Sequence, residues 1–270
     1  MVGRAVPAEP FAKHWQNGIA AFQSRRSVPS LQVLPLRGRM PGMIADSTPI
    51  RESLALLRSV ADRNGYPIET FREDGLQCVI FSEVFDLEED FLGSYWAFRG
   101  ASDAEAAAIL RFWIRHATRK TKTMEFGHSL KWSLGRLLAE KGRLVEDLLA
   151  PVLRQTDWSS YDAPQFLLAG LAAFPDGAER AIELLDIVPE DARDGLFIAC
   201  WLLPARNVQR KLLAKSLAWI ADPAWHGYPN EAYWLRCFLC KWMAQGTFSL
   251  RRLAPLVQWA ARREFEHLVR

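Results

Sequence analysis

Two short motifs have the residue types and the spacing that a metal site would use. Glu125-Phe-Gly-His128 and Glu264-Phe-Glu-His267 each place a carboxylate three residues before an imidazole, which puts both groups on one face of a helix. Paired motifs of this kind on facing helices hold the metals of ferritin-like di-iron proteins. Such sites also need two further inward-facing Glu on long helices, whereas the helices expected here are short. We therefore expect no metal and no cofactor, and these four residues remain the candidates for a metal-dependent enzyme.

Other signatures of catalysis are absent from the sequence. It contains no nucleophile elbow, no glycine-rich dinucleotide loop, no Walker phosphate loop and no His-Glu-x-x-His zinc helix. Cys237 and Cys240 share a face of an expected helix, but no second Cys or His pair completes zinc-finger spacing. We assign no catalytic residue, although an acid–base pair needs no local motif and an enzyme stays an alternative.

Charged residues form two separate groups along the chain. The basic group recurs at spacings of four, four and three on an expected helix: Arg111, Arg115, Arg119 and Lys122. The acidic group follows much later: Glu183, Asp186, Glu190, Asp191 and Asp194. A solvated helix face is the simplest interpretation of each group, but both are candidate partner-binding surfaces. Their separation favours a protein partner, and nucleic acid is the alternative because a basic ridge can contact phosphates.

Composition limits the classes of protein to which this chain can belong. Its 270 residues, half of them hydrophobic and 24% charged, are enough to bury a full core. A net charge of +3 is too small to imply a nucleic-acid partner by itself. The 11 Trp suit either core layers or contact surfaces, and core is the simpler interpretation.

The sequence also predicts a location. No run of about 18 apolar residues occurs, so we expect no membrane segment. Residues 1–10 lack the apolar core of a secretory signal. We therefore expect a cytoplasmic protein with reduced thiols.

Hydrophobic periodicity predicts a mainly α fold with one small β-hairpin. The hairpin is expected near residues 68–81, where two apolar runs flank an Asp-Gly turn. Ser102-Asp-Ala-Glu105 has the pattern of a capping box at a helix start. Helices are expected at 11–22, 49–63, 102–118, 124–141, 143–155, 163–174, 178–187, 191–202, 207–220, 231–244 and 250–268, separated by Pro, Gly and Asp stops.

These elements suggest three segments. Residues 1–48 are expected to form a helix and an extended connector, and residues 49–100 a small α+β segment that contains the hairpin and an acidic helix start at 83–90. Residues 101–270 are expected to form an irregular stack of short antiparallel helices, similar to an α-solenoid.

One stretch carries a resemblance to a known family. In Glu146–Trp158 a leucine-rich helix with an internal Pro runs into an Asp-containing turn, and a second apolar helix follows at Phe166–Phe174. Leu253-Ala-Pro-Leu-Val257 echoes Leu149-Ala-Pro-Val-Leu153. Residues 143–220 thus resemble a HEAT-like helical repeat, which implies stacked helix pairs. The segments differ in length and fit no fixed period, so a compact irregular helical domain is the alternative.

Together these patterns favour a non-catalytic protein-binding module. A bacterial immunity protein, inhibitor or adaptor that captures one protein partner would suit a helical chain with polar ridges and no catalytic motif. The two alternatives are an enzyme with a carboxylate and histidine metal site, and a helical nucleic-acid-binding protein.

Overall fold

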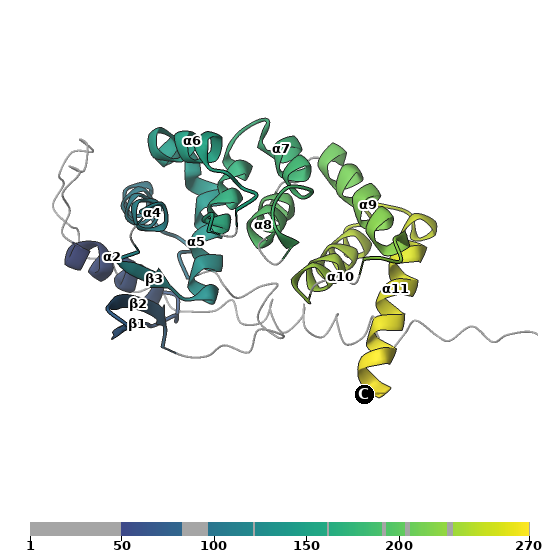
Figure 1. The fold of residues 1–270 in the computed structure, drawn as a ribbon, viewed down its shortest axis with the longest axis horizontal. Helices are drawn as coiled ribbons and strands as arrows, with labels where there is room; N and C mark the ends of the chain where they lie inside the picture. Colours follow the sequence, from purple (N-terminus) through teal and green to yellow (C-terminus); the bar gives the residue numbers. More distant parts are fainter. Residues whose placement is uncertain are drawn as a thin grey trace, which may run out of the picture. The chain divides into compact units, whose positions relative to one another are not determined.

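The computed structural model describes residues 50–82, 97–120, 122–160, 162–190, 193–202, 206–225 and 229–269, all within one compact unit, Ile44–Arg270. The expected helix at 11–22, the connector after it and the acidic segment at 83–90 lie outside these residues. The described chain is mainly helical with a small sheet, as predicted (Figure 1). None of its helices is long and apolar enough to cross a membrane.

A helix and a hairpin open the described chain. α2 (Ile50–Asp62) precedes β1 (Ile68–Glu73) and β2 (Leu76–Phe81), which pair in antiparallel fashion. The two turn residues, Asp74 at φ 49° and Gly75 at φ 81°, both have the positive φ that a two-residue type I′ turn requires. The predicted helix at 49–63 and the hairpin are both confirmed.

The sheet contains a third strand that the sequence did not predict. β3 (Met124–Phe126) pairs parallel to β2, with Gln77 opposite Met124, and gives the order β1-β2-β3. The predicted helix at 124–141 is therefore too long, because α5 begins only at His128 and ends at Lys141. Three residues are too few to show the period of a strand.

α4 (Asp103–Ala117) begins with the predicted capping box. The Ser102 hydroxyl accepts a hydrogen bond from the Glu105 backbone N–H at 3.3 Å, and the Glu105 carboxylate accepts one from the Ser102 N–H at 2.8 Å. Two N–H groups that the helix cannot satisfy itself are thus bonded.

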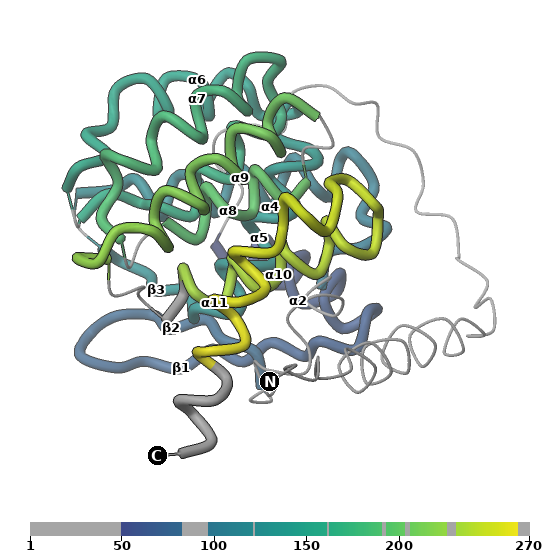
Figure 2. The backbone as a smooth tube through the Cα atoms, turned by 90° about the vertical axis from the view of Figure 1, so that its right-hand side faces the viewer, coloured from purple at the N-terminus to yellow at the C-terminus, as the bar shows by residue number. Residues whose placement is uncertain are grey.

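A series of short helices completes the fold. In chain order they are η1 (Gly142–Val145), α6 (Glu146–Gln155), η2 (Gln165–Ala173), α7 (Gly177–Leu184), α8 (Asp194–Leu202), α9 (Arg206–Ala221), α10 (Pro229–Ala244) and α11 (Leu250–Val269). Helices were predicted over these places, but the single helix predicted at 143–155 is divided into η1 and α6, and both η1 and η2 are 3-10 helices. η2 packs on both α5 and α8. α7 packs on α8, and α9 and α10 both pack on α11 (Figures 1 and 2).

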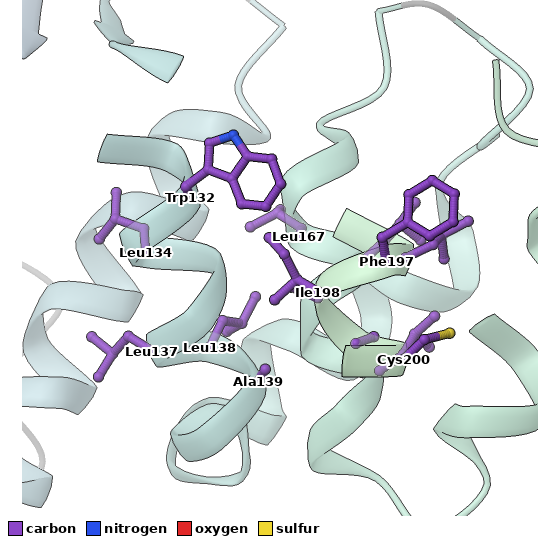
Figure 3. Packing of buried hydrophobic residues seen from close by; sticks show 14 of the residues in the cluster. Trp132, Leu134, Leu137, Leu138, Ala139, Leu167, Phe197, Ile198 and Cys200 are labelled. Atoms are coloured by element: carbon purple, nitrogen blue, oxygen red, sulfur yellow. The ribbon is translucent and has the colours of Figure 1, made fainter. Parts of the chain in front are cut away.

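The core is continuous from the sheet to α11. In its middle, Leu138 of α5, Leu167 of η2 and Ile198 of α8 lie in one buried cluster (Figure 3). The backbones of η2 and α8 approach closely because Gly195 has no side chain, and a Cβ there would lie 2.3 Å from the Gln165 carbonyl oxygen.

Candidate functional site

The predicted basic stripe is not one continuous helical ridge. α4 ends at Ala117, so Arg119 and Lys122 lie in the segment that follows the helix, and that part of the prediction is wrong. Arg111 is engaged within the fold, because its guanidinium donates two hydrogen bonds of 2.8 and 2.9 Å to the Asp147 carboxylate. This bidentate pair connects α4 to α6.

The segment between α4 and β3 nevertheless exposes positive charge. Arg119, Lys120 and Lys122 are all exposed, and we call these three residues the basic loop. Lys122 Nζ lies 3.8 Å from Glu125, whose carboxylate also accepts a hydrogen bond of 2.5 Å from Lys131. Within the described residues no ion pair involves Arg119 or Lys120.

The residues of the predicted acidic group do not form one surface either. Asp186 pairs with Lys215 of α9, and Glu183 lies 3.3 Å from Arg180. Glu190 is half-buried, and Asp191 lies outside the described residues.

Asp194 is buried rather than exposed, which corrects its predicted role in partner binding. It is the first residue of α8, and its carboxylate accepts a hydrogen bond of 3.1 Å from the indole N–H of Trp234 on α10. It therefore holds two helices together.

The structure does not place Glu125 and His128 on one helix face. Glu125 belongs to β3, whereas His128 is the first residue of α5. Glu264 and His267 both lie on α11, where the structure describes the course of the helix but not these two side chains. Among the described residues, no group of three or more His, Cys, Asp and Glu side chains is arranged to hold a metal ion.

His128 instead lies beside Asp194. Its Nε2 accepts a hydrogen bond of 2.8 Å from the indole N–H of Trp132 and lies 3.7 Å from Asp194 Oδ2. The His128 side chain is 54% exposed, whereas that of Asp194 is 3% exposed. Partial burial, and then the charge of Lys131, lower the pKa of His128. The neutral ring is favoured, which agrees with its acceptance of the Trp132 proton.

The tryptophans near this cluster belong to the core. We call the following chain of ring contacts the aromatic seam: Trp132, Trp234, Phe238, Trp242 and Phe248. Trp132 and Trp234 stack with their centroids 5.1 Å apart. The indole N–H groups also find polar partners. Buried Trp242 donates a hydrogen bond of 2.7 Å to Gln209, and half-buried Trp225 donates one of 2.9 Å to Glu231.

α11 presents an apolar surface that the sequence analysis missed. Its buried side packs into the core through Leu253, Leu256, Trp259 and Ala260. A second row, at spacings of four, three and four, lies on another side of the helix: Leu250, Ala254, Val257 and Ala261. Leu250 is 69% exposed and Val257 is 39% exposed.

Two exposed arginines, Arg251 and Arg262, lie along one side of this second row. We call the row and these two arginines the α11 surface. Its signal in the sequence is a second set of apolar residues at helical spacing, beside the set that packs into the core.

Comparisons with known proteins returned no match among protein-family models, curated proteins or solved structures.

Proposed function

We propose that this chain is a non-catalytic protein-binding module. The observation that carries the proposal is the α11 surface, where Leu250 and Val257 remain exposed although the same helix has a complete buried row. An exposed apolar row of this kind, bordered by charged side chains, is typical of an interaction site.

The charged residues divide between two roles under this proposal. Arg111, Asp186 and Asp194 bond to residues of other helices, whereas Glu183 pairs with Arg180 on α7 itself. The basic loop provides charge that can steer a partner with an acidic surface. An immunity, inhibitor or adaptor role, in which one protein is captured, fits such a module.

The test is capture of a partner from native lysate, followed by binding measurements with the purified pair. We expect Leu250→Asp and Val257→Asp each to weaken binding by at least about tenfold, since a buried carboxylate would lack a partner at the interface. Leu144→Asp is the matched control, because Leu144 is an exposed leucine on η1. Binding that survives both α11 changes would contradict the proposal.

The position of His128 beside the buried Asp194 favours one second candidate, an enzyme with a carboxylate and histidine metal site. This candidate predicts stoichiometric iron, manganese or zinc in the purified protein, and loss of that metal in His128→Ala. Elemental analysis of both proteins tests it.

A further inference from the structure

We infer that the α11 surface binds an amphipathic helix with acidic flanks, supplied by a partner protein. This inference rests on the proposed function and names the chemistry of the partner.

The spacing of the apolar row suits a helical partner. Leu250 and Val257 are seven residues apart, or about two helical turns, and therefore point in nearly the same direction. Ala254 and Ala261 alternate with them along the same line. Large and small side chains in alternation give a ridge with depressions, into which the side chains of a second helix can pack.

The charge beside the row defines the flanks of the partner. No Asp or Glu occurs between Ser249 and Arg263. Arg251 and Arg262 are exposed on one side of the row, and within the described residues neither forms an ion pair. The complementary helix would thus carry Asp or Glu beside its apolar stripe, because opposite charges at the rim speed association and fix the register.

The composition of the row favours a protein partner over a membrane as the binding partner of the α11 surface. A helix that lies in a membrane interface inserts Trp, Phe and Leu side chains from its apolar face. Two of the four residues in the row, Ala254 and Ala261, are alanines, and Ala254 is half-buried. This row is shallow and suits the close approach of a helix more than insertion into lipid.

The inference can be tested with the full-length protein and a designed peptide. The probe is a fluorescein-labelled helical peptide of about 16 residues, with Leu at positions i, i+4, i+7 and i+11 and Glu beside this stripe. Fluorescence anisotropy should show saturable binding that weakens with salt. A peptide of the same composition in scrambled order should not bind.

Charge reversal identifies the surface. The double variant Arg251→Glu with Arg262→Glu should bind the Glu peptide at least about tenfold more weakly, and a peptide with Lys in place of Glu should bind that variant more tightly than it binds the wild type. Arg154→Glu with Arg210→Glu is the matched control, because both arginines are exposed on other helices.

Three outcomes would overturn the inference: no binding of the Glu peptide, equal binding by the arginine double variant, or binding to phosphatidylserine vesicles that needs Leu250 while the peptide does not bind. If a native partner needs Leu250 and Val257 but the Glu peptide does not bind, only this inference fails and the protein-binding function stands. If a native partner binds independently of the α11 surface, the proposed function fails as well.

Discussion

Arg193 and Glu231 form an ion pair between the start of α8 and the first turn of α10, and their side chains are only 10% and 0% exposed. Glu231 also accepts a hydrogen bond from Trp225, and Arg193 donates one of 3.0 Å to the Val188 carbonyl. Removing both charges from water is costly, so each group depends on the other.

Glu231→Gln should therefore destabilise the protein strongly. The change leaves the buried guanidinium without its charge partner, and we expect the free energy of unfolding to fall by about 3–5 kcal/mol. Urea denaturation followed by far-UV circular dichroism measures this. In the exposed pair with Arg180, Glu183→Gln should cost less than about 1 kcal/mol, and equal losses in the two variants would contradict the structural role of the buried pair.

Two histidines should make the stability depend on pH. Burial, together with a neighbouring positive charge from Arg119 and Lys131 respectively, lowers the pKa of His116 and of His128. The unfolded chain then binds more protons than the folded chain as the pH falls through about 6.5, so stability present above that pH is lost below it. Urea denaturation at pH 7.5 and 5.5 should show this loss.

Replacing each histidine separates its share of the pH effect. His116→Gln and His128→Gln should each reduce the difference in stability between pH 7.5 and 5.5, since glutamine does not titrate. A difference that is unchanged in both variants would show that other groups cause it.

Single residues were the hardest part of the candidate site to predict from sequence. The charge pattern correctly marked exposed Arg119 and Lys122, yet it also included Asp194, which is buried. The contact that buries Asp194 comes from Trp234, on a helix that begins much later in the chain. No local pattern contains this information, because it depends on how α8 and α10 pack.

At the scale of elements, the close approach of η2 and α8 depends on Gly195. A methyl group there would lie 2.3 Å from the Gln165 carbonyl oxygen, which belongs to the backbone and cannot rotate away. We expect Gly195→Ala to lower the free energy of unfolding by about 1–3 kcal/mol or more. Thermal and urea denaturation check this.

Gly135 on α5 provides a control for that substitution. A Cβ at Gly135 would meet Ala169 and Ile198 at 3.4 Å, an ordinary contact distance. Gly135→Ala should therefore be nearly neutral or stabilising, since alanine is the better helix former by about 1 kcal/mol. If both variants lose the same stability, close backbone packing is not the cause.

We expect the protein to bind nucleic acid only weakly at physiological salt, although the basic loop is exposed. If the loop neutralised phosphates, affinity for duplex DNA would fall steeply with salt, with a slope near −0.9 per phosphate on a log–log plot. Arg119→Glu with Lys122→Glu should instead slow association with a protein partner and leave the helix content unchanged. Submicromolar, salt-sensitive binding to random duplex that this variant abolishes would favour a nucleic-acid function.

Most elements were predictable because their signals are local. Apolar periodicity and the Pro, Gly and Asp stops located the helices, and the Asp-Gly turn located the hairpin. β3 was not predictable, since its three residues depend on pairing with the distant β2. η2 was expected to be an α-helix, and its 3-10 geometry accompanies close packing against α5 and α8, which propensity does not encode.

At the scale of the whole molecule, the aromatic seam connects α5 to α10 and to Phe248 before α11. One continuous core predicts one cooperative unfolding transition. Far-UV circular dichroism, near-UV circular dichroism and tryptophan fluorescence should give the same urea midpoint. A stack of independent HEAT-like repeats would instead unfold in steps from its ends, with midpoints that differ between probes.

The parallel pairing of β2 with β3 has a consequence for how the chain reaches this fold. The hairpin can close as soon as its turn forms, but Gln77 must wait for Met124, which follows the whole of α4. Bringing such distant segments together costs loop-closure entropy and is slow. During synthesis, therefore, one edge of β2 stays open while the hairpin already exists, and an open strand edge is where nascent chains associate with one another.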